Sequence, residues 1–175
     1  VAGHDPAELR GPELLRQIAY VPQDPTDLFY SETVAKECAA TDRDLGQPAG
    51  SAYRRLLDLV ETVDPQTHPR DLSAGQQLAL ALAIQLGTAP DVVLLDEPTR
   101  GLDYPGKVAF GRWLDMLAER GCSILLATHD VELVAVAGDR VIVLADGEVV
   151  TDADVRTALT SSPAFAPQVQ KVLAP

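Results

Sequence analysis

Three short aliphatic runs that lack polar alternation limit this chain to a small set of folds. Val92–Leu95 is the clearest of them, and Ile124–Ala127 and Val141–Ala145 repeat its pattern. Such runs are typical of strands that are covered on both faces in a parallel sheet. Helical patterns at residues 106–120 and 131–137 lie between the runs. The sequence therefore predicts right-handed βαβ crossovers and an α/β sandwich.

Upstream of these runs, the sequence predicts one more strand and a mostly helical segment. Ile18–Val21 is a short apolar run closed by Pro22, which favours a buried strand that ends in a loop. Helical spacing or capping residues predict three helices, at residues 33–40, 53–63 and 74–86. Residues 41–51 are rich in Asp, Gly and Pro, which predicts a loop.

These elements predict one domain that spans residues 1–175. Within it, we expect residues 31–71 to form a helical subdomain. Asp146–Gly147 predicts a hairpin turn near the end of the domain. Residues 151–175, which contain several prolines, are expected to form a small C-terminal appendage.

Charge and cysteine content exclude several classes of function. The chain has 175 residues, a formal net charge of -12 and only 14 scattered Lys and Arg residues. A nucleic-acid partner would require these residues to cluster on one face. Cys38 and Cys122 lie far apart in no metal-binding pattern, which argues against a disulfide framework or a zinc site and fits a reducing cytoplasm. No apolar run approaches the roughly 18 residues of a membrane span, so any membrane role is predicted to be peripheral.

Two consecutive carboxylates end the Val92–Leu95 run. Asp96 and Glu97 stand at the carboxyl end of the predicted strand, where ligands bind in doubly wound sheets. Neighbouring strand residues point to opposite sides, so we expect the two carboxylates to have different tasks. One can hold the water shell of Mg²⁺, and the other can orient or deprotonate a water molecule. The alternative is a strand that simply ends in a polar turn.

The segment Leu72–Gln76 opens the third predicted helix. Ser73 is placed as its N-cap, and backbone amides follow at Ala74 and Gly75. A helix N-terminus that carries a hydroxyl and a glycine favours anion binding through its amides and its dipole. An ordinary serine cap is the alternative.

Gln23 and His129 each follow the end of a predicted strand. An imidazole can donate a hydrogen bond to a phosphate or to a catalytic water, and an amide offers both a donor and an acceptor without charge. For His129, a purely structural role is the alternative, and Gln23 alone is a weak indication.

Five motifs resemble those of ABC ATPases, and they occur in that family's order. Leu72–Gln76 matches the signature Leu-Ser-Gly-Gly-Gln except at Ala74, where the backbone of a first helical residue accommodates alanine. The strand that ends in Asp96 and Glu97 is a second motif. The other three are a Q-loop, a D-loop and a switch motif, at Tyr20–Asp24, Thr99–Asp103 and Ala127–Asp130.

The resemblance implies a P-loop NTPase-type sheet and a nucleotide site shared between two cassettes. In such a site Asp96 and Gln23 would support Mg²⁺, Glu97 would be the general base, and His129 and Gln23 would sense the terminal phosphate of ATP. The signature residues would close on ATP held by the other cassette; they are Ser73, Ala74, Gly75 and Gln76. Asp103 would cross the interface between the cassettes.

The phosphate-binding loop of that family is not found in this sequence. There is no G-x-x-x-x-G-K-[ST] motif, and Lys36, Lys107 and Lys171 lie in no glycine-rich loop. We therefore expect an N-terminal truncation that places this loop and its strands upstream of Val1. This chain alone is expected to be inactive.

Within the family, the chain is most similar to energy-coupling factor (ECF) transporter ATPases. The similarity lies in Gln23–Phe29, and Gln77–Ile84 resembles the second half of fused, duplicated ECF forms. It implies an ATP-hydrolysing subunit on the cytoplasmic face of the membrane that powers uptake of a vitamin or a metal ion. Its partners would be a second cassette, in a homodimer or a fused or heterodimeric pair, and a transmembrane coupling subunit. Alternatives are a degenerate, non-hydrolysing cassette that acts as an interaction partner, and a soluble non-transport ABC ATPase.

The surface that contacts the membrane subunit is expected between Asp24 and Cys38. An apolar and aromatic cluster, Leu28–Tyr30, lies just before the predicted helix cap at Ser31. Acidic residues surround it, namely Asp24, Asp27 and Glu32. This composition suits a basic, amphipathic helix with aromatic contacts at its centre. The alternative is that Phe29 packs as core.

Overall fold

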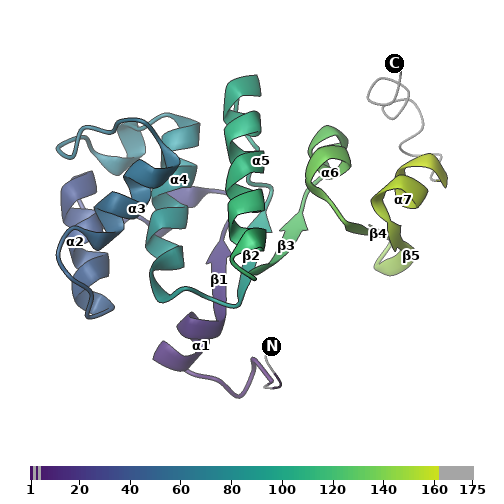
Figure 1. Ribbon diagram of the computed structural model, residues 1–175, viewed down its shortest axis with the longest axis horizontal. Helices are drawn as coiled ribbons and strands as arrows, with labels where there is room; N and C mark the ends of the chain where they lie inside the picture. The colour runs from purple at the N-terminus through teal and green to yellow at the C-terminus, as the bar shows by residue number, and fades with distance from the viewer. Residues whose placement is uncertain (2, 4, 162–175) are drawn as a thin grey trace. The chain divides into compact units, whose positions relative to one another are not determined.

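The computed structural model describes residues 1, 3 and 5–161, and the chain divides into two compact units, Val1–Ala127 and Thr128–Pro175. The first unit contains the parallel sheet and the helices expected before and after the signature segment (Figure 1). The second contains a β-hairpin and two short helices. Each unit is described below by itself.

A three-stranded parallel sheet organises the first unit. Its strands are β1 (Ile18–Val21), β2 (Val92–Asp96) and β3 (Ser123–Ala127), with β2 in the centre. Val21 pairs with Leu95 of β2, so β1 and β2 end at the same edge. The predicted α/β architecture with parallel strands is confirmed.

The two faces of this sheet differ. Alternate residues of β1 and β2 are buried on one face, where helices pack against the strands; they are Ala19, Val21, Val93 and Leu95. On the other face Tyr20 and Leu125 are 47% and 61% exposed. Within the described residues, these strands are thus covered on one face, and the predicted coverage of the other face stays a prediction.

The segment between β1 and β2 is helical, as predicted. It contains α2 (Val34–Asp44), α3 (Ser51–Leu59) and α4 (Ala74–Gln85), with α3 packed on both α2 and α4. The short helices α1 (Pro12–Gln17), η1 (Pro25–Leu28), η2 (Pro69–Asp71) and η3 (Leu86–Thr88) connect the other elements. Helix α5 (Tyr104–Glu119) joins β2 to β3 as a crossover, and in Figure 1 it lies beside them.

The loop predicted over residues 41–51 is wrong at both ends, because α2 continues to Asp44 and α3 begins at Ser51. The Thr41 hydroxyl donates to the Glu37 carbonyl at 3.1 Å, inside the helix. The Asp42 carboxylate accepts from the backbone N–H groups of Ser51 and Ala52 at 3.0 and 2.8 Å. Residues with a local preference for loops are thus used to cap the next helix.

In the second unit, β4 (Arg140–Ala145) and β5 (Glu148–Asp154) form an antiparallel pair between α6 (Val131–Ala137) and α7 (Val155–Ser161). Asp146 and Gly147 have φ angles of 52° and 81°, which confirms the predicted two-residue turn. The interpretation of residues 141–145 as another strand of the parallel sheet is wrong for the described residues, where β4 pairs with β5 in a two-stranded sheet. The aliphatic pattern of a strand does not identify the segment with which it pairs. Val131 and Leu159 form a small core between the two helices.

The appendage predicted over residues 151–175 is described only as far as Ser161. Its first four residues continue β5, and α7 follows. The Pro-rich remainder, residues 162–175, lies outside the described residues.

Candidate functional site

The carboxyl edge of the parallel sheet brings together three of the predicted site residues. Asp96 is the last residue of β2 and is half-buried, and Glu97 follows it. Gln23 is exposed and comes two residues after the end of β1, the strand paired with β2. Topology alone therefore places an amide and two carboxylates at the edge where ligands bind in sheets of this type.

Glu97 has an unusual backbone conformation. Its φ angle is 45°, in the left-handed region that side chains other than glycine rarely adopt. Its N–H donates to the Ala127 carbonyl at 2.8 Å, and its own carbonyl accepts from the Arg100 N–H at 3.1 Å. These bonds fix a tight turn directly after β2, at a conformational cost on the order of 1 kcal/mol. We predicted regular strand alternation here, and no feature of the sequence signalled the turn at Glu97.

The signature segment forms a complete capping box at the start of α4. Ser73 Oγ accepts from the Gln76 N–H at 3.3 Å, and Gln76 Oε1 accepts from the Ser73 N–H at 3.1 Å. Gln76 Nε2 also donates to the Thr62 carbonyl at 3.2 Å. Ser73 is confirmed as the N-cap, while nucleotide contact by Ser73, Gly75 and Gln76 stays a prediction. The first backbone amides of the helix are the groups that such a site would offer to a phosphate.

The predicted D-loop lies against the signature segment of the same chain. A Cβ added at Gly101 would come 3.5 Å from Ala74 Cβ, and one added at Gly75 would come 3.8 Å from Leu102 Cδ2. The turn after Glu97 therefore lies within van der Waals contact of the first turn of α4. Asp103 caps α5 by accepting from the Gly106 N–H at 2.9 Å. Its predicted reach across a cassette interface stays a prediction.

His129 belongs to the second unit, where it precedes α6. Its neighbours form local caps: Thr128 Oγ1 accepts from the Asp130 N–H at 3.1 Å, and Asp130 Oδ1 accepts from the Leu133 N–H at 3.1 Å. The His129 side chain is exposed. Its role toward the carboxylates of the first unit stays a prediction.

The turn after Gln23 is stabilised by a carboxylate. Asp24 Oδ1 accepts from the Thr26 hydroxyl at 2.7 Å and from the Thr26 N–H at 2.9 Å. These bonds, with weaker attraction from Arg70 and Arg100, lower the pKa of Asp24 below its usual value. The negative charge of Asp24 thus helps to fix the first turn of the loop.

The residues at the edge fit Mg²⁺ bound together with a nucleotide better than a protein-only metal cage. Within residues 5–161, no three His, Cys, Asp or Glu side chains form a group that could hold a metal ion. Mg²⁺ commonly takes one or two carboxylates and completes its shell with phosphate oxygens and water. A half-buried Asp96 at a strand end suits that requirement.

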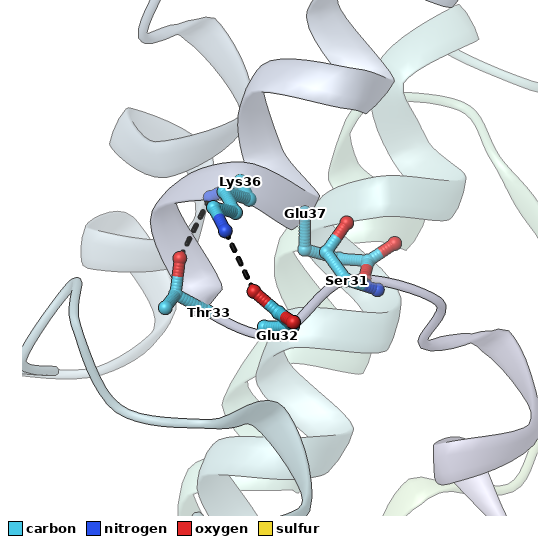
Figure 2. Close-up of polar contacts among 5 residues, drawn as sticks. All are labelled: Ser31, Glu32, Thr33, Lys36 and Glu37. Carbon is cyan, nitrogen blue, oxygen red and sulfur yellow. Dashed lines mark hydrogen bonds and ion pairs between the residues drawn. The ribbon is translucent and has the colours of Figure 1, made fainter.

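The structure tests two details of the surface predicted for a membrane subunit, and that surface itself stays a prediction. Phe29 is 6% exposed and belongs to the core, whereas Tyr30 is 88% exposed. The cap of α2 is Thr33, whose side chain accepts from the Lys36 N–H at 3.2 Å, and not Ser31 (Figure 2). The prediction of Phe29 as a surface contact is therefore wrong, because alternate residues of an extended loop face in and out.

The parallel sheet, its crossover helix and the helical segment form the α/β fold of ABC ATPase domains. Two solved structures have this fold. CbiO1 from Clostridium perfringens, described as part of the ABC transporter complex cbiONQ, has a TM-score of 0.73 and 27% identity, with 93% of this chain and 66% of that chain covered. A dimeric ATP-binding cassette in a post-hydrolysis state with ADP and Pi has a TM-score of 0.68 and 25% identity, with 85% and 69% covered.

Sequence comparisons assign the family. The family model described as "AAA domain, putative AbiEii toxin, Type IV TA system" matches residues 12–135. A "Putative ABC transporter ATP-binding protein" of Streptomyces avermitilis is 50% identical over all of this chain, which covers 31% of that relative. The energy-coupling factor transporter ATP-binding protein EcfA of Methanocaldococcus jannaschii is 33% identical over 80% of this chain and 52% of its own length. The family model, which spans more than half of the chain, shows that this chain belongs to that family of AAA domains, and the chain is similar in sequence to ABC transporter ATP-binding proteins.

Two further facts bear on how the family assignment applies here. The chain spans about a third of the length of the Streptomyces relative. In the part of the chain that the structure describes, no helix is long and apolar enough to cross a membrane.

Proposed function

We propose that this chain is part of an ATP-hydrolysing subunit that powers a membrane transporter. The observation that carries the proposal is the carboxyl edge of the sheet, where the topology brings Asp96, Glu97 and Gln23 together. In addition, the first turn of α4, which holds the signature segment, contacts the turn after Glu97. Similarity to ABC transporter ATP-binding proteins and to a solved ATP-binding cassette supports ATP as the nucleotide.

Each residue at the edge has a distinct proposed task. Bound Mg²⁺ would supply charge neutralisation for the phosphate oxygens of ATP, and Asp96 would hold it together with Gln23. Glu97 takes the proton of the attacking water, and the Gln23 amide orients that water. His129, which belongs to the second unit, would donate a hydrogen bond to the terminal phosphate.

The signature helix would act on a different ATP molecule. Ser73, the first amides of α4 and the Gln76 side chain would close on ATP held by a second cassette, and Asp103 would contact that cassette. The dimeric state named for one of the structural relatives supports this arrangement.

We further propose ECF-type uptake of a vitamin or a metal ion. The similarity to EcfA and the cbiONQ complex named for the structural relative support this choice. The subunit would then work at the cytoplasmic face of the membrane, bound to a transmembrane coupling subunit. The transported substrate would be chosen by a separate membrane protein.

The residues of this chain alone should not retain ATP. Backbone amides and a lysine from a phosphate-binding loop normally hold the β- and γ-phosphates, and no such motif occurs in the sequence. We expect isothermal titration of the 175-residue chain with Mg-ATP to show no micromolar binding. Micromolar affinity would contradict this part of the proposal.

Phosphate release by the complete protein tests the central proposal. Hydrolysis of ATP is expected with Mg²⁺ and should stop when EDTA removes it. A complete protein that binds ATP but releases no phosphate, alone or with its membrane subunit, would instead be the non-hydrolysing cassette.

A further inference from the structure

The last turn of the signature helix α4 is held by side chains from other segments. The helix itself, Ala74–Gln85, contains no charged residue. Arg55 of α3 donates from Nε to the Ala83 carbonyl at 2.9 Å. Gln47, in the loop before α3, donates from Nε2 to the Gly87 carbonyl in η3. Because the last carbonyls of a helix lack partners within it, these donors satisfy groups that α4 and η3 leave open.

Arg55 and Gln47 form one network. Arg55 Nη1 donates to Gln47 Oε1 at 2.8 Å, which joins the two donors. Burial lowers the pKa of Arg55, and attraction from Asp42 on α2 acts in the opposite direction. A Cβ added at Gly87 would come 3.0 Å from Arg55 Nη2, so the guanidinium lies directly against the end of the signature helix. A cation at this end also complements the helix dipole.

Stability alone is a poor explanation for an arginine at this position. Its Nη2 atom is buried and has no hydrogen-bond partner among the residues that the structure describes. Burying a cation with an unused donor costs free energy, which an apolar side chain of similar length would avoid. The guanidinium instead adds direction, because its rigid fork reaches the Ala83 carbonyl and the Gln47 amide at the same time.

The body of α4 benefits from such a fixed point. Residues Leu78–Ala83 are buried, and apolar contacts specify the axial position of a helix less sharply than hydrogen bonds do. At the other end, Gln76 Nε2 donates to the Thr62 carbonyl at 3.2 Å. A helix rises about 1.5 Å per residue, so Ala83 and Ser73 are joined by a stiff element of roughly 15 Å. A shift at Ala83 would therefore move the signature segment.

We propose that Arg55, oriented by Gln47, is a positioning residue for ATP hydrolysis, which sets the place of the signature segment from the far end of α4. This role rests on the proposed function, in which Ser73 and the first amides of α4 close on ATP held by a second cassette. Arg55 does not touch the nucleotide. Its loss should lower hydrolysis, which requires closure, and spare the binding of ATP, which precedes closure.

Arg55→Met in the complete protein tests the proposal. Phosphate release at saturating Mg-ATP should fall about tenfold, because misplaced groups lose much of their contribution to the reaction. The Kd for Mg-ATP, from isothermal titration, should stay within about twofold. Arg55→Lys should recover part of the lost activity, since it keeps the charge but not the rigid fork. Unchanged hydrolysis in Arg55→Met, or equal losses of hydrolysis and affinity, would overturn the proposal.

Gln47→Leu tests the route through the network. It should lower hydrolysis about threefold, and the double variant should be no slower than Arg55→Met alone, because the two residues act as one unit. Additive losses would contradict that unit. Amide hydrogen exchange gives a second readout: the N–H groups of Gln76 and Gln77, which bond to Ser73, should exchange faster in Arg55→Met.

Two control variants separate positioning from general effects. Arg54→Met removes the neighbouring arginine, which is exposed and donates to Ser51 Oγ at 3.3 Å, and hydrolysis should stay unchanged. Val34→Ala removes buried apolar contacts of α2 outside the network, so it should lower stability but leave hydrolysis within about twofold. Equal losses of hydrolysis in Val34→Ala and Arg55→Met would show a general folding effect and overturn the proposal.

Failure of the proposed function would look different. The parent protein would then bind ATP and release no phosphate, and faster exchange at Gln76 and Gln77 in Arg55→Met would assign Arg55 to the placement of α4 without a part in hydrolysis. A parent protein that hydrolyses ATP, combined with unchanged hydrolysis and exchange in Arg55→Met, would refute the positioning role alone.

Discussion

Two pairs of carboxylates in the first unit are used in different ways. Glu37 and Asp42 lie on α2 with 5% and 2% exposure, and each accepts two backbone N–H groups from a neighbouring segment. Asp96 ends β2 and Glu97 follows it at the edge of the sheet; both are half-buried, and Glu97 has a strained φ angle. The first pair stabilises the helical segment, whereas the second is placed where a ligand can reach it. A carboxylate in the sequence therefore indicates a ligand-binding or catalytic role only when the fold places it at an edge that a ligand can reach.

The largest expected effect is on catalysis at the second pair. Glu97→Gln keeps the size of the side chain and removes the base, so ATP hydrolysis by the complete protein should fall about 10²-fold or more, the scale of lost general base catalysis. Nucleotide affinity and thermal stability should change little. Phosphate release and isothermal titration on the same preparation measure both quantities. Activity within twofold of the parent protein would exclude Glu97 as the base.

The next effect concerns stability at the first pair. Asp42→Ala leaves the N–H groups of Ser51 and Ala52 without their side-chain acceptor at the start of α3, which should cost about 2 kcal/mol. Urea unfolding of the complete protein would show it as a lower midpoint. The comparison of the two pairs would fail if Asp42→Ala reduced hydrolysis in the folded protein as strongly as Glu97→Gln does.

Sequence alone predicted the features that depend on neighbouring residues and failed for those that depend on segments far away in the chain. Val92–Leu95 predicted a strand and Ser73 a helix cap, because apolar patterning and capping are local properties that need no partner segment. The local preference of Asp42 predicted a loop. This prediction failed because Asp42 lies in α2 and its carboxylate accepts two amides from residues nine and ten positions later. Val141–Ala145 has the composition of a buried parallel strand, yet β4 pairs antiparallel with β5, because composition alone does not identify the pairing partner of a strand.

The candidate site shows the same limit. The motif at the end of β2 identified Asp96 and Glu97, and strand order alone brought Gln23 to their edge. The left-handed turn at Glu97 depends on a hydrogen bond to β3, about thirty residues away, so no local pattern reveals it. The choice between Phe29 and Tyr30 as the exposed aromatic likewise depends on packing against other segments.

A smaller effect should expose the strain at Glu97. At a φ angle of 45°, glycine avoids the steric conflict that alanine keeps, so Glu97→Gly should be about 1 kcal/mol more stable than Glu97→Ala. At Ala39, an exposed position of α2, the order should reverse, with Ala39→Gly less stable by about 1 kcal/mol. Chemical denaturation of the four proteins gives both differences. The same order at both positions would mean that Glu97 is not strained.

The smallest expected effect is at Asp24, which combines features of both pairs: it accepts two hydrogen bonds but remains exposed. Because the pKa of Asp24 is lowered in the folded protein, its contribution is present above the ordinary aspartate pKa and is lost as pH falls through the folded value, below about pH 4. Thr26→Val removes the hydroxyl that is the main cause of the shift, so the Asp24 pKa should rise toward its ordinary value. Solvent screening should keep the change in stability at pH 7 near the limit of detection. NMR titration of the Asp24 carboxyl carbon measures the pKa directly. An unchanged value in Thr26→Val would show that the backbone N–H at position 26, together with Arg70 and Arg100, lowers the pKa and that the threonine hydroxyl does not.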